Sequence, residues 1–387
     1  MARITIKHKR EKPILNQHPW IFSGAINSYE GTIQPGDIVS IRAHDGQFLA
    51  QGYWNPNSQI EVRLLSWEND PIDEHWWRKM LHQAIHARAG LTNTAYRLIN
   101  AENDYLPGLI VDRYGDWLVM QALTLGIEKR KHMIADILSV LLDIQGIYER
   151  SDVDIRKKEG LSLHTGLIWG KEPPEELTIQ ENGLSIIVDV YNGHKTGFYL
   201  DQAENRARVG QLAKGKRVLN LFSYTGGFGV HALANGADYV VNVDSSIEAL
   251  QLAETNLAQN NLPLARAEHI QADVFVYLRE ITEQYDLVIL DPPKFAHNKQ
   301  QLESAARGYK DINLQAFNAV KPGGYLMTYS CSGALSADLF QKIVFSALAD
   351  SGRQAQIIQH LQAGQDHPVA LTFPEGEYLK GLLLRVY

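Results

Sequence analysis

The stretch RVLNLFSYTGGFGVH, residues 217–231, decides the fold: an apolar run leads into a glycine-rich loop and then into a segment able to form a helix. A strand that turns into a helix through glycines points backbone N–H groups at a nucleotide-like ligand. Gly226, Gly227 and Gly229 do not have the G-x-G-x-x-G spacing of dinucleotide-binding proteins. No Gly-Lys-Ser/Thr follows to hold a triphosphate. The loop therefore predicts an adenosine-type cofactor without specifying which one.

Three aspartates follow the later apolar runs, each where a strand should end. The β-branched run 239–243 precedes Asp244, at the position where such folds hold ribose hydroxyls. Asp273 comes where a third strand should end, so its carboxylate could meet an adenine amino group. The buried run 285–290 precedes Asp291. Strands ending in acidic residues, with helical patterns between them, predict an α/β fold with a doubly wound parallel sheet and a site at its carboxyl edge.

Several longer motifs identify a family. GHKTGFYLDQAENR, FSYTGGFG, DPPKF, RGYKDIN, SCSG and PEGEYLKG occur in this order between residues 193 and 387. Together they resemble the bacterial 23S rRNA (cytosine-C5)-methyltransferase I family. The resemblance implies a Rossmann-like class I methyltransferase domain with a seven-stranded sheet, and S-adenosylmethionine as cofactor. It implies that Phe198 and Gln202 close over the methionine end of the cofactor. The other cofactor-binding residues that it implies are Phe222, Ser223, Tyr224, Thr225, Gly226, Gly227, Asp244, Ser245, Asp273, Val274, Asp291 and Pro292.

The chemistry of this family predicts a role for the single cysteine. Carbon 5 of cytosine is a poor nucleophile until a thiolate adds to carbon 6. Cys331 stands at the end of an expected strand, beside the strand that ends at Asp291. A lone cysteine is more commonly a small buried apolar residue, but the flanking serines and glycine favour a nucleophile here. Asp291 could hydrogen-bond cytosine N3 and its amine, and Lys195 and Lys294 are candidates for lowering the pKa of Cys331 or holding a phosphate. The base that removes the carbon-5 proton is unassigned.

Composition sets the remaining limits. At 387 residues, 45% of them hydrophobic, the chain is long enough for two or three domains. No apolar run reaches about 18 residues, and no apolar signal core follows the basic first residues, so we expect a cytoplasmic protein without a transmembrane helix. One cysteine excludes a disulfide framework, and the 14 histidines lack a ligand spacing such as H-E-x-x-H, so we expect no metal site.

The chain in order suggests three domains. Residues 1–72 show short apolar runs and turns, including the hairpin signal Asp45-Gly46, and resemble the RNA-binding PUA β-barrel of the family. Residues 73–180 resemble its small α+β middle domain, which would shape one wall of an RNA cleft. Residues 181–387 form the methyltransferase domain. Trp20 and Trp54 could stack on bases or pack in the barrel core.

A net charge of −7 is unusual for a protein that binds RNA, because lysine and arginine supply most phosphate contacts. A local basic face can act within a Debye length of about 10 Å. Two clusters could form such a face or a plain solvated surface. The first is Arg3, Lys7, Lys9, Arg10 and Lys12, and the second is Arg150, Arg156, Lys157 and Lys158.

Other functions stay open. An exocyclic N-methyltransferase typically has an aromatic residue after Asp-Pro-Pro to stack on a flipped base, and Lys294 occupies that position. A non-catalytic RNA-binding assembly factor would keep the fold without the reaction. A nicotinamide dehydrogenase lacks its glycine fingerprint. The resemblance implies 23S rRNA as substrate, with one cytosine modified, and is compatible with a homodimer.

Overall fold

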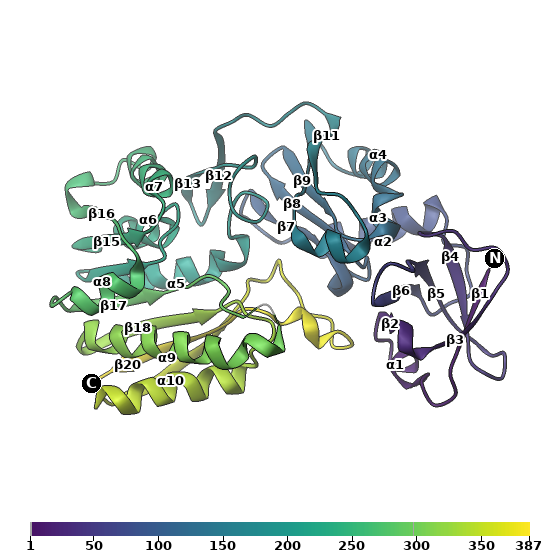
Figure 1. The fold of residues 1–387 in the computed structure, drawn as a ribbon. Coiled ribbons are helices and arrows are strands. Elements are labelled where there is room, and N and C mark those ends of the chain that lie inside the picture. Colours follow the sequence, from purple (N-terminus) through teal and green to yellow (C-terminus); the bar gives the residue numbers. More distant parts are fainter. Residues whose placement is uncertain (1, 297) are drawn as a thin grey trace. The chain divides into compact units, whose positions relative to one another are not determined.

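The structure, a computed structural model, describes residues 2–296 and 298–387 (Figure 1). By contacts the chain divides into two units, each assembled from three separate segments. The first unit comprises Met1–Ile179, Val188–Leu200 and Gln365–Gly376. The second comprises Gln180–Ile187, Asp201–Gly364 and Glu377–Tyr387. The division into domains 1–72, 73–180 and 181–387 stays a prediction.

The first unit begins with a six-stranded sheet in the order β2-β6-β5-β4-β1-β3. Its elements are β1 (Arg3–Ile6), α1 (Lys12–Leu15), β2 (Trp20–Phe22), β3 (Ile26–Glu30), β4 (Ile38–Arg42), β5 (Phe48–Trp54) and β6 (Ile60–Ser66). Isoleucine and valine side chains fill its core because alternate positions of each strand face inward. The predicted hairpin at Asp45-Gly46 joins β4 to β5, with Gly46 at a φ of 90° that favours glycine.

A five-stranded sheet in the order β11-β10-β9-β8-β7 follows in the same unit. Its elements are α2 (Glu74–His86), β7 (Ala95–Asn100), β8 (Leu109–Tyr114), β9 (Trp117–Ala122), α3 (Leu125–Glu128), α4 (Lys131–Leu141), β10 (Gly146–Ser151) and β11 (His164–Gly170). Asp73 begins α2 by accepting a hydrogen bond from the Trp76 N–H.

Buried polar contacts join these two sheets. Arg63 on β6 pairs with Glu102 at 3.1 Å and with Glu159 at 2.7 Å, and all three side chains are buried. The Tyr53 hydroxyl donates to the Pro107 carbonyl at 2.6 Å. Removing one partner of such a buried ion pair typically costs about 3–5 kcal/mol, so the two sheets behave as one unit.

The two later segments of the first unit are also fixed by hydrogen bonds. Arg150 donates to the carbonyl of Val190 at 2.7 Å, and Tyr114 and Thr196 share a hydroxyl bond of 2.9 Å. Asp366 accepts the backbone N–H of Arg97 at 2.8 Å. These contacts explain why the chain returns to the first unit twice.

The second unit contains a seven-stranded sheet in the order β16-β15-β14-β17-β18-β20-β19. Its strands are β14 (Arg217–Leu221), β15 (Tyr239–Asp244), β16 (Ala267–Gln271), β17 (Tyr285–Leu290), β18 (Val320–Ser330), β19 (Ala355–Gln362) and β20 (Lys380–Val386). Strand β20 runs antiparallel to both its neighbours, and the five strands from β16 to β18 are parallel. The predicted seven-stranded doubly wound sheet is confirmed. A separate hairpin pairs β12 (Leu177–Glu181) with β13 (Leu184–Val188).

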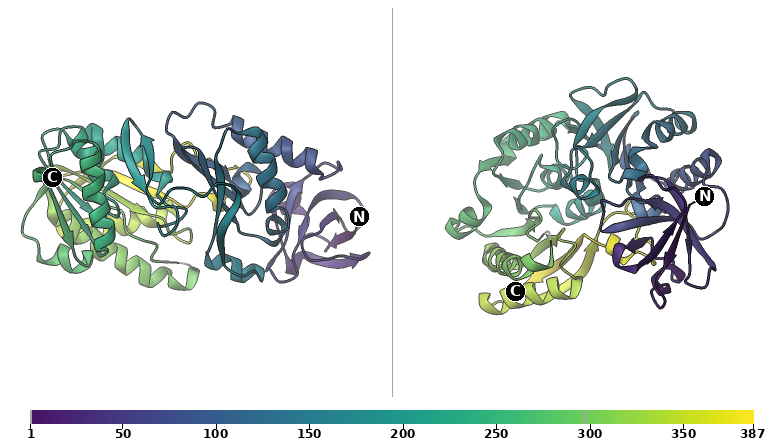
Figure 2. Two further views of the ribbon diagram at one scale, coloured as in Figure 1. Left: turned by 90° about the horizontal axis from the view of Figure 1, so that it is seen from above. Right: turned by 45° about the vertical axis from the view of Figure 1, so that its right-hand side comes forward.

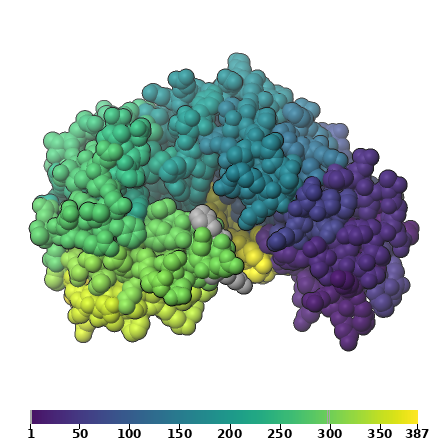
Figure 3. Space-filling model, viewed as in Figure 1, coloured from purple at the N-terminus to yellow at the C-terminus, as the bar shows by residue number. Residues whose placement is uncertain are grey.

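Two groups of helices cover this sheet (Figure 2). The first is α5 (Ala203–Ala213), α6 (Gly227–Ala234) and α7 (Ile247–Gln259); the second is α8 (Val274–Glu280), α9 (Leu302–Ala319) and α10 (Ala337–Ser351). Right-handed crossovers on either side of β14 place the groups on opposite faces. Figure 3 shows one face of the molecule in a space-filling view, coloured by residue number. None of the helices in the described part of the chain combines the length and apolar character needed to cross a bilayer.

Candidate active site

The loop between β14 and α6 adopts an uncommon backbone conformation. Phe222, Tyr224 and Gly226 have φ values of 56°, 47° and 74°. Left-handed conformations cost a non-glycine residue about 1–2 kcal/mol each, and such strain gathers at functional sites. At Gly226 a Cβ atom would also lie 2.6 Å from the Cβ of Ala253. Position 226 therefore requires glycine, which lets a ligand approach the backbone of the loop closely.

Two buried hydroxyls in this loop fit a ligand. Ser223 Oγ and Thr225 Oγ1 are buried and have no hydrogen-bond partner among the residues that the structure describes. Buried polar groups are nearly always paired, so these two hydroxyls are available to bond polar atoms of a ligand. Asp244 ends β15, and its carboxylate accepts the N–H groups of Tyr224 at 2.8 Å and Ser246 at 3.0 Å. Free hydroxyls beside an oriented carboxylate fit the amino-acid and ribose ends of an adenosine-type cofactor.

After strand β16, Asp273 acts as the N-terminal cap of helix α8. Asp273 begins α8, and its Oδ1 accepts the N–H groups of Phe275 at 2.8 Å and Val276 at 3.2 Å. Val274 is buried, as a residue packed on an adenine ring would be, while the Ser245 side chain is exposed. The cofactor contacts predicted for these residues stay predictions.

Asp291 and Gln202 lie together. The Gln202 amide donates to Asp291 Oδ2 at 2.9 Å, and its own oxygen accepts from Asn205 at 2.6 Å. Asn205 also donates to the carbonyl of Gln362 at 3.0 Å. This chain of amides fixes the Asp291 carboxylate, which is followed by the buried Pro292. The predicted contact of Gln202 with a cofactor stays a prediction.

Cys331 follows directly after β18 and is half-buried. Leu290 pairs with Thr328 in the parallel register of β17 and β18, so Asp291 and Cys331 both emerge at the carboxyl edge of the sheet. Neighbouring strands lie about 5 Å apart, which brings the two residues to one side of the site.

Buried hydroxyls hold the turn that carries Cys331. Ser330 donates to the Tyr309 hydroxyl at 2.9 Å, and that hydroxyl shares a bond of 3.1 Å with Ser332. Ser332 Oγ also accepts the N–H of Ala296 at 3.2 Å. The turn after β17 and the turn after β18 are thereby tied to each other and to α9.

Comparisons with known proteins agree with this geometry. Residues 164–375 match the family model of S-adenosylmethionine-dependent methyltransferases, and residues 4–67 match that of PUA-like domains. A ribosomal RNA large subunit methyltransferase I from Tolumonas auensis is 50% identical over 99% of this chain and 98% of its own length. One from Aeromonas salmonicida is 50% identical over 97% of each chain. The chain belongs to the ribosomal RNA large subunit methyltransferase I family.

Solved structures share the fold of this family member. A methyltransferase complexed with SAH aligns over the whole of both chains at a TM-score of 0.86 and 24% identity. A SAM-dependent methyltransferase from Streptococcus mutans aligns over the whole of both chains at 0.84 and 23% identity. The predicted family, fold class and S-adenosylmethionine cofactor are therefore confirmed, and the glycine loop with Ser223, Thr225 and Asp244 fits that cofactor.

The lysines predicted to assist Cys331 are placed differently. Lys294 is exposed beside the Asp291 turn. Lys195 and Phe198 belong to the first unit, where the Lys195 ammonium lies 4.6 Å from the centre of the Tyr199 ring and the Phe198 N–H donates to Tyr114. Their roles toward the cofactor and the thiol stay predictions.

Sequence reasoning missed residues that support the site from a distance. Tyr309 and Lys380 hold the Cys331 turn, and Lys380 donates to the carbonyls of Ser332 and Leu335. Both lie in motifs that identified the family, RGYKDIN and PEGEYLKG, but nothing local to either residue signals this contact.

A buried ion cluster also escaped the sequence reading. Arg206 makes two hydrogen bonds of 2.6 Å to Glu181, which also accepts from His231 on α6 at 3.1 Å. Burial alone raises the pKa of Glu181, but Arg206 and His231 outweigh it and lower the pKa to about 2. The cluster fixes helix α6, which begins at the glycine loop.

The two basic clusters differ in how many of their side chains are exposed. Arg150 and Arg156 in the second cluster are buried and bonded to backbone carbonyls, so only Lys157 and Lys158 face solvent. The five basic residues of the first cluster are all exposed. The first cluster is therefore the better candidate for RNA contact.

The two tryptophans of the first sheet are engaged within the protein. Both are partly buried, and their indole N–H groups donate to carboxylates at 2.8 Å, Trp20 to Glu102 and Trp54 to Glu61. These contacts favour the packing role over base stacking.

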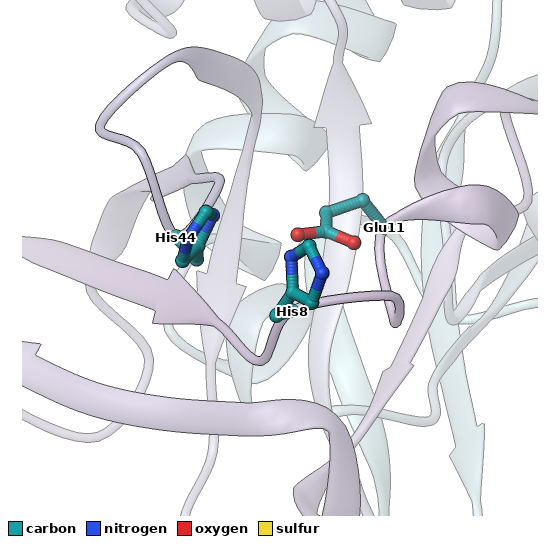
Figure 4. Close-up of side chains that lie close together, drawn as sticks. All are labelled: His8, Glu11 and His44. Carbon is teal, nitrogen blue, oxygen red and sulfur yellow. The ribbon is translucent and has the colours of Figure 1, made fainter.

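Three residues of the first unit could hold a metal ion. His8, Glu11 and His44 lie together, with ligand atoms within 4.8 Å of one another (Figure 4). The sequence spacing did not suggest this group because His44 comes from the β4–β5 hairpin. Both histidines are exposed, and the neighbouring Lys7, Lys9, Arg10 and Lys12 repel cations.

Proposed function

We propose that this methyltransferase forms 5-methylcytosine in 23S rRNA through a covalent bond between Cys331 and carbon 6 of the target cytosine. The observation that carries the proposal is the position of the single cysteine. Cys331 stands at the carboxyl edge of the sheet, directly after β18, the neighbour of the strand that precedes Asp291, in a turn fixed by buried hydroxyls.

The chemistry follows from the electronic structure of cytosine. S-adenosylmethionine supplies an electrophilic methyl group. The Cys331 thiolate adds to carbon 6, and the electrons of the carbon 5–carbon 6 double bond make carbon 5 nucleophilic. Carbon 5 forms a bond to the methyl carbon as the bond from that carbon to the sulfonium sulfur breaks, which leaves S-adenosylhomocysteine. Carbon 5 then loses its proton to water or hydroxide. The electrons of that C–H bond restore the double bond as the carbon–sulfur bond breaks and the thiolate is released.

Asp291 would orient the base. Its carboxyl group, when protonated or sharing a proton with the ring, can hydrogen-bond cytosine N3 and the exocyclic amine and draw electrons away from carbon 6. Gln202 holds Asp291 Oδ2 at 2.9 Å and thus fixes the direction of this contact. The cofactor would lie on the loop of Ser223, Thr225 and Gly226, with Asp244 toward its ribose.

The RNA substrate is supported by family membership and by the PUA-like region. The exposed basic residues of the first cluster would contact phosphates. Since rRNA is the substrate of this proposal, the enzyme would act in the cytoplasm. A homodimer stays a prediction, which light scattering at micromolar concentration checks.

One observation weighs against an exocyclic N-methyltransferase. Phe295, the aromatic residue nearest to Asp-Pro-Pro, packs on Tyr309 with ring centres 4.6 Å apart and on Phe275 at 5.7 Å. A ring packed in this way is not free to stack on a flipped base. Lys294 in the preceding position is exposed and has no ring.

Replacing Cys331 by alanine tests the proposal. We expect C331A to lose methyl transfer to 23S rRNA while it binds SAH with unchanged affinity by calorimetry. Bisulfite sequencing of rRNA from cells with and without the protein should show one protected cytosine that depends on Cys331. Methylation by C331A at the wild-type rate would contradict the covalent mechanism. Failure of the wild-type protein to bind SAH would instead indicate a non-catalytic assembly factor.

A further inference from the structure

Lys380, the first residue of β20, is an unusual buried cation. It pairs with Ser330 in the register of β18 and β20, one residue before Cys331. Its side chain is buried, with a relative exposure of 6% for the residue. Lysine is almost never buried unless its ammonium is satisfied. The burial of a lysine next to the turn that carries Cys331 therefore requires a structural reason.

The Lys380 ammonium binds the turn through backbone carbonyls. Nζ lies 2.8 Å from the oxygen of Ser332 and 2.6 Å from that of Leu335. Two of its three N–H donors are thus used on the residues that follow Cys331. Within residues 2–296 and 298–387, no carboxylate forms a salt bridge with it. The two carbonyl oxygens accept hydrogen bonds from the ammonium, but each carries only a partial negative charge.

The charged groups around this pair come from several elements. Exposed Glu377, just before β20, attracts the ammonium, and exposed Lys294, after β17, repels it. Burial lowers the pKa of Lys380, and a negative charge on Cys331 acts in the opposite direction. From α9, Tyr309 faces Cys331, and burial raises the pKa of its phenol, which keeps it neutral near pH 7. Water screens the exposed charges much more than it screens a buried one.

We propose that Lys380 is a positioning residue whose buried ammonium fixes the Ser332–Leu335 turn and stabilises the thiolate form of Cys331. A thiol beside a buried cation ionises more readily, which is how reactive cysteines are commonly activated. This inference deepens the proposed function and rests on it for its catalytic meaning. It assigns to Lys380 the task that the sequence suggested for Lys294 and Lys195.

The single cysteine makes the test direct, because alkylation of the full chain by iodoacetamide reports on Cys331 alone. The rate is measured from pH 5 to pH 10 for wild type, Lys380→Met and Lys380→Arg. We expect the midpoint of the Lys380→Met profile to rise by about one pH unit, which slows alkylation by about tenfold at pH values well below both midpoints. Lys380→Arg keeps the charge and should keep a midpoint near that of wild type.

A matched control removes another lysine from the same pair of strands. Lys321→Met, at the far end of β18, deletes an ammonium that pairs with Asp286 at 3.0 Å and should leave the midpoint unchanged. If Lys380→Met does not fold, Lys380→Gln keeps a donor for the carbonyls without the charge, and the same rise is expected. A wild-type thiol midpoint at or above about 8.5, the ordinary value, would overturn the proposal, as would an unchanged midpoint in folded Lys380→Met.

Two readouts separate this inference from the proposed function. The alkylation profile measures ionisation of the thiol whether or not the thiol is a nucleophile in the reaction. Methyl transfer by C331A decides the covalent mechanism without reference to Lys380. If both hold, the acid limb of the pH profile for methyl transfer should move upward in Lys380→Met together with the thiol midpoint.

Discussion

The two halves of the site at the sheet edge are held in different ways. The proposed cofactor half consists of the loop 222–227 and Asp244, and the backbone determines its shape, with left-handed φ values at Phe222, Tyr224 and Gly226. The proposed nucleophile half consists of Asp291 and Cys331, and side chains from other elements fix it. Tyr309 comes from α9 and Lys380 from β20.

This difference predicts which substitutions disrupt each half of the site. A loop whose shape depends on its backbone tolerates many changes of neighbouring side chains. It is disrupted when a glycine gains a Cβ atom. The turn that carries Cys331 is held by buried side chains of other elements. It is therefore disrupted when a hydroxyl or ammonium group on one of those elements is removed. Substitutions in one half should therefore leave the other largely intact.

The largest effect on cofactor binding should come from Gly226→Ala. The new Cβ would require a left-handed alanine and would meet Ala253 at 2.6 Å, so we expect SAH affinity to fall at least about tenfold, or about 1.4 kcal/mol. Calorimetry measures this. The control is Gly333→Ala in the nucleophile half, where nothing lies within 4 Å of the new methyl group. Equal SAH affinity in Gly226→Ala and wild type would refute the backbone description of the cofactor half.

The ion cluster beneath the cofactor half should make stability depend on pH. The pKa of Glu181 is lowered from its ordinary 4.5 to about 2, so the carboxylate stabilises the fold by about 3 kcal/mol when ionised in both states. Because the folded pKa is the lower one, this contribution is complete above about pH 4.5 and is lost as the pH falls toward 2. Urea unfolding of wild type and Glu181→Gln at pH 7, 4 and 3 measures it. A difference in stability that stays constant over this range would exclude the effect.

In the nucleophile half, Tyr309→Phe removes the hydroxyl between Ser330 and Ser332. Leaving those buried groups short of a partner should cost about 1–3 kcal/mol of stability and slow methyl transfer, with SAH affinity unchanged. Thermal melts and initial rates measure the two losses. Tyr325→Phe is the matched control, since its hydroxyl accepts from Arg385 at 2.8 Å at a less buried point of β18. The halves would not be independent if Tyr309→Phe weakened SAH binding as much as methyl transfer.

The smallest effect is expected from chelation. Among the residues that the structure describes, neither half offers a metal-ligand set, so EDTA should leave the rate of methyl transfer within about twofold of the untreated enzyme. Zinc titration of wild type and His44→Ala checks the group of His8, Glu11 and His44, which we expect to bind only weakly because both histidines are exposed among basic residues. A strong loss of activity in EDTA would contradict this expectation, because it would show that methyl transfer depends on a bound metal ion.

The same difference explains what the sequence could predict. The glycine loop, the strand ends and Cys331 leave local signals, because a left-handed turn demands glycine and parallel strands end at one edge. Tyr309 and Lys380 lie 23 and 48 residues from Ser332, which they both contact, and no local pattern joins them.

The sequence also did not reveal which charged side chains are buried. Arg156 looked like part of a surface cluster, yet it is fully buried and donates to the carbonyl of Ser162. Tertiary packing therefore decided what local composition left open.

The interleaved segments of the first unit have a consequence for synthesis on the ribosome. Residues 188–200 and 365–376 belong to that unit, and most of the second unit is translated between them. Until Asp366 has emerged, the side chain of Arg88 and the backbone of Arg97 lack the bonds that it supplies. The N-terminal sheets therefore reach their final state late, through contacts of large sequence separation that slow folding. A fragment that stops before residue 365 should unfold at a lower urea concentration than the same sheets in the full chain.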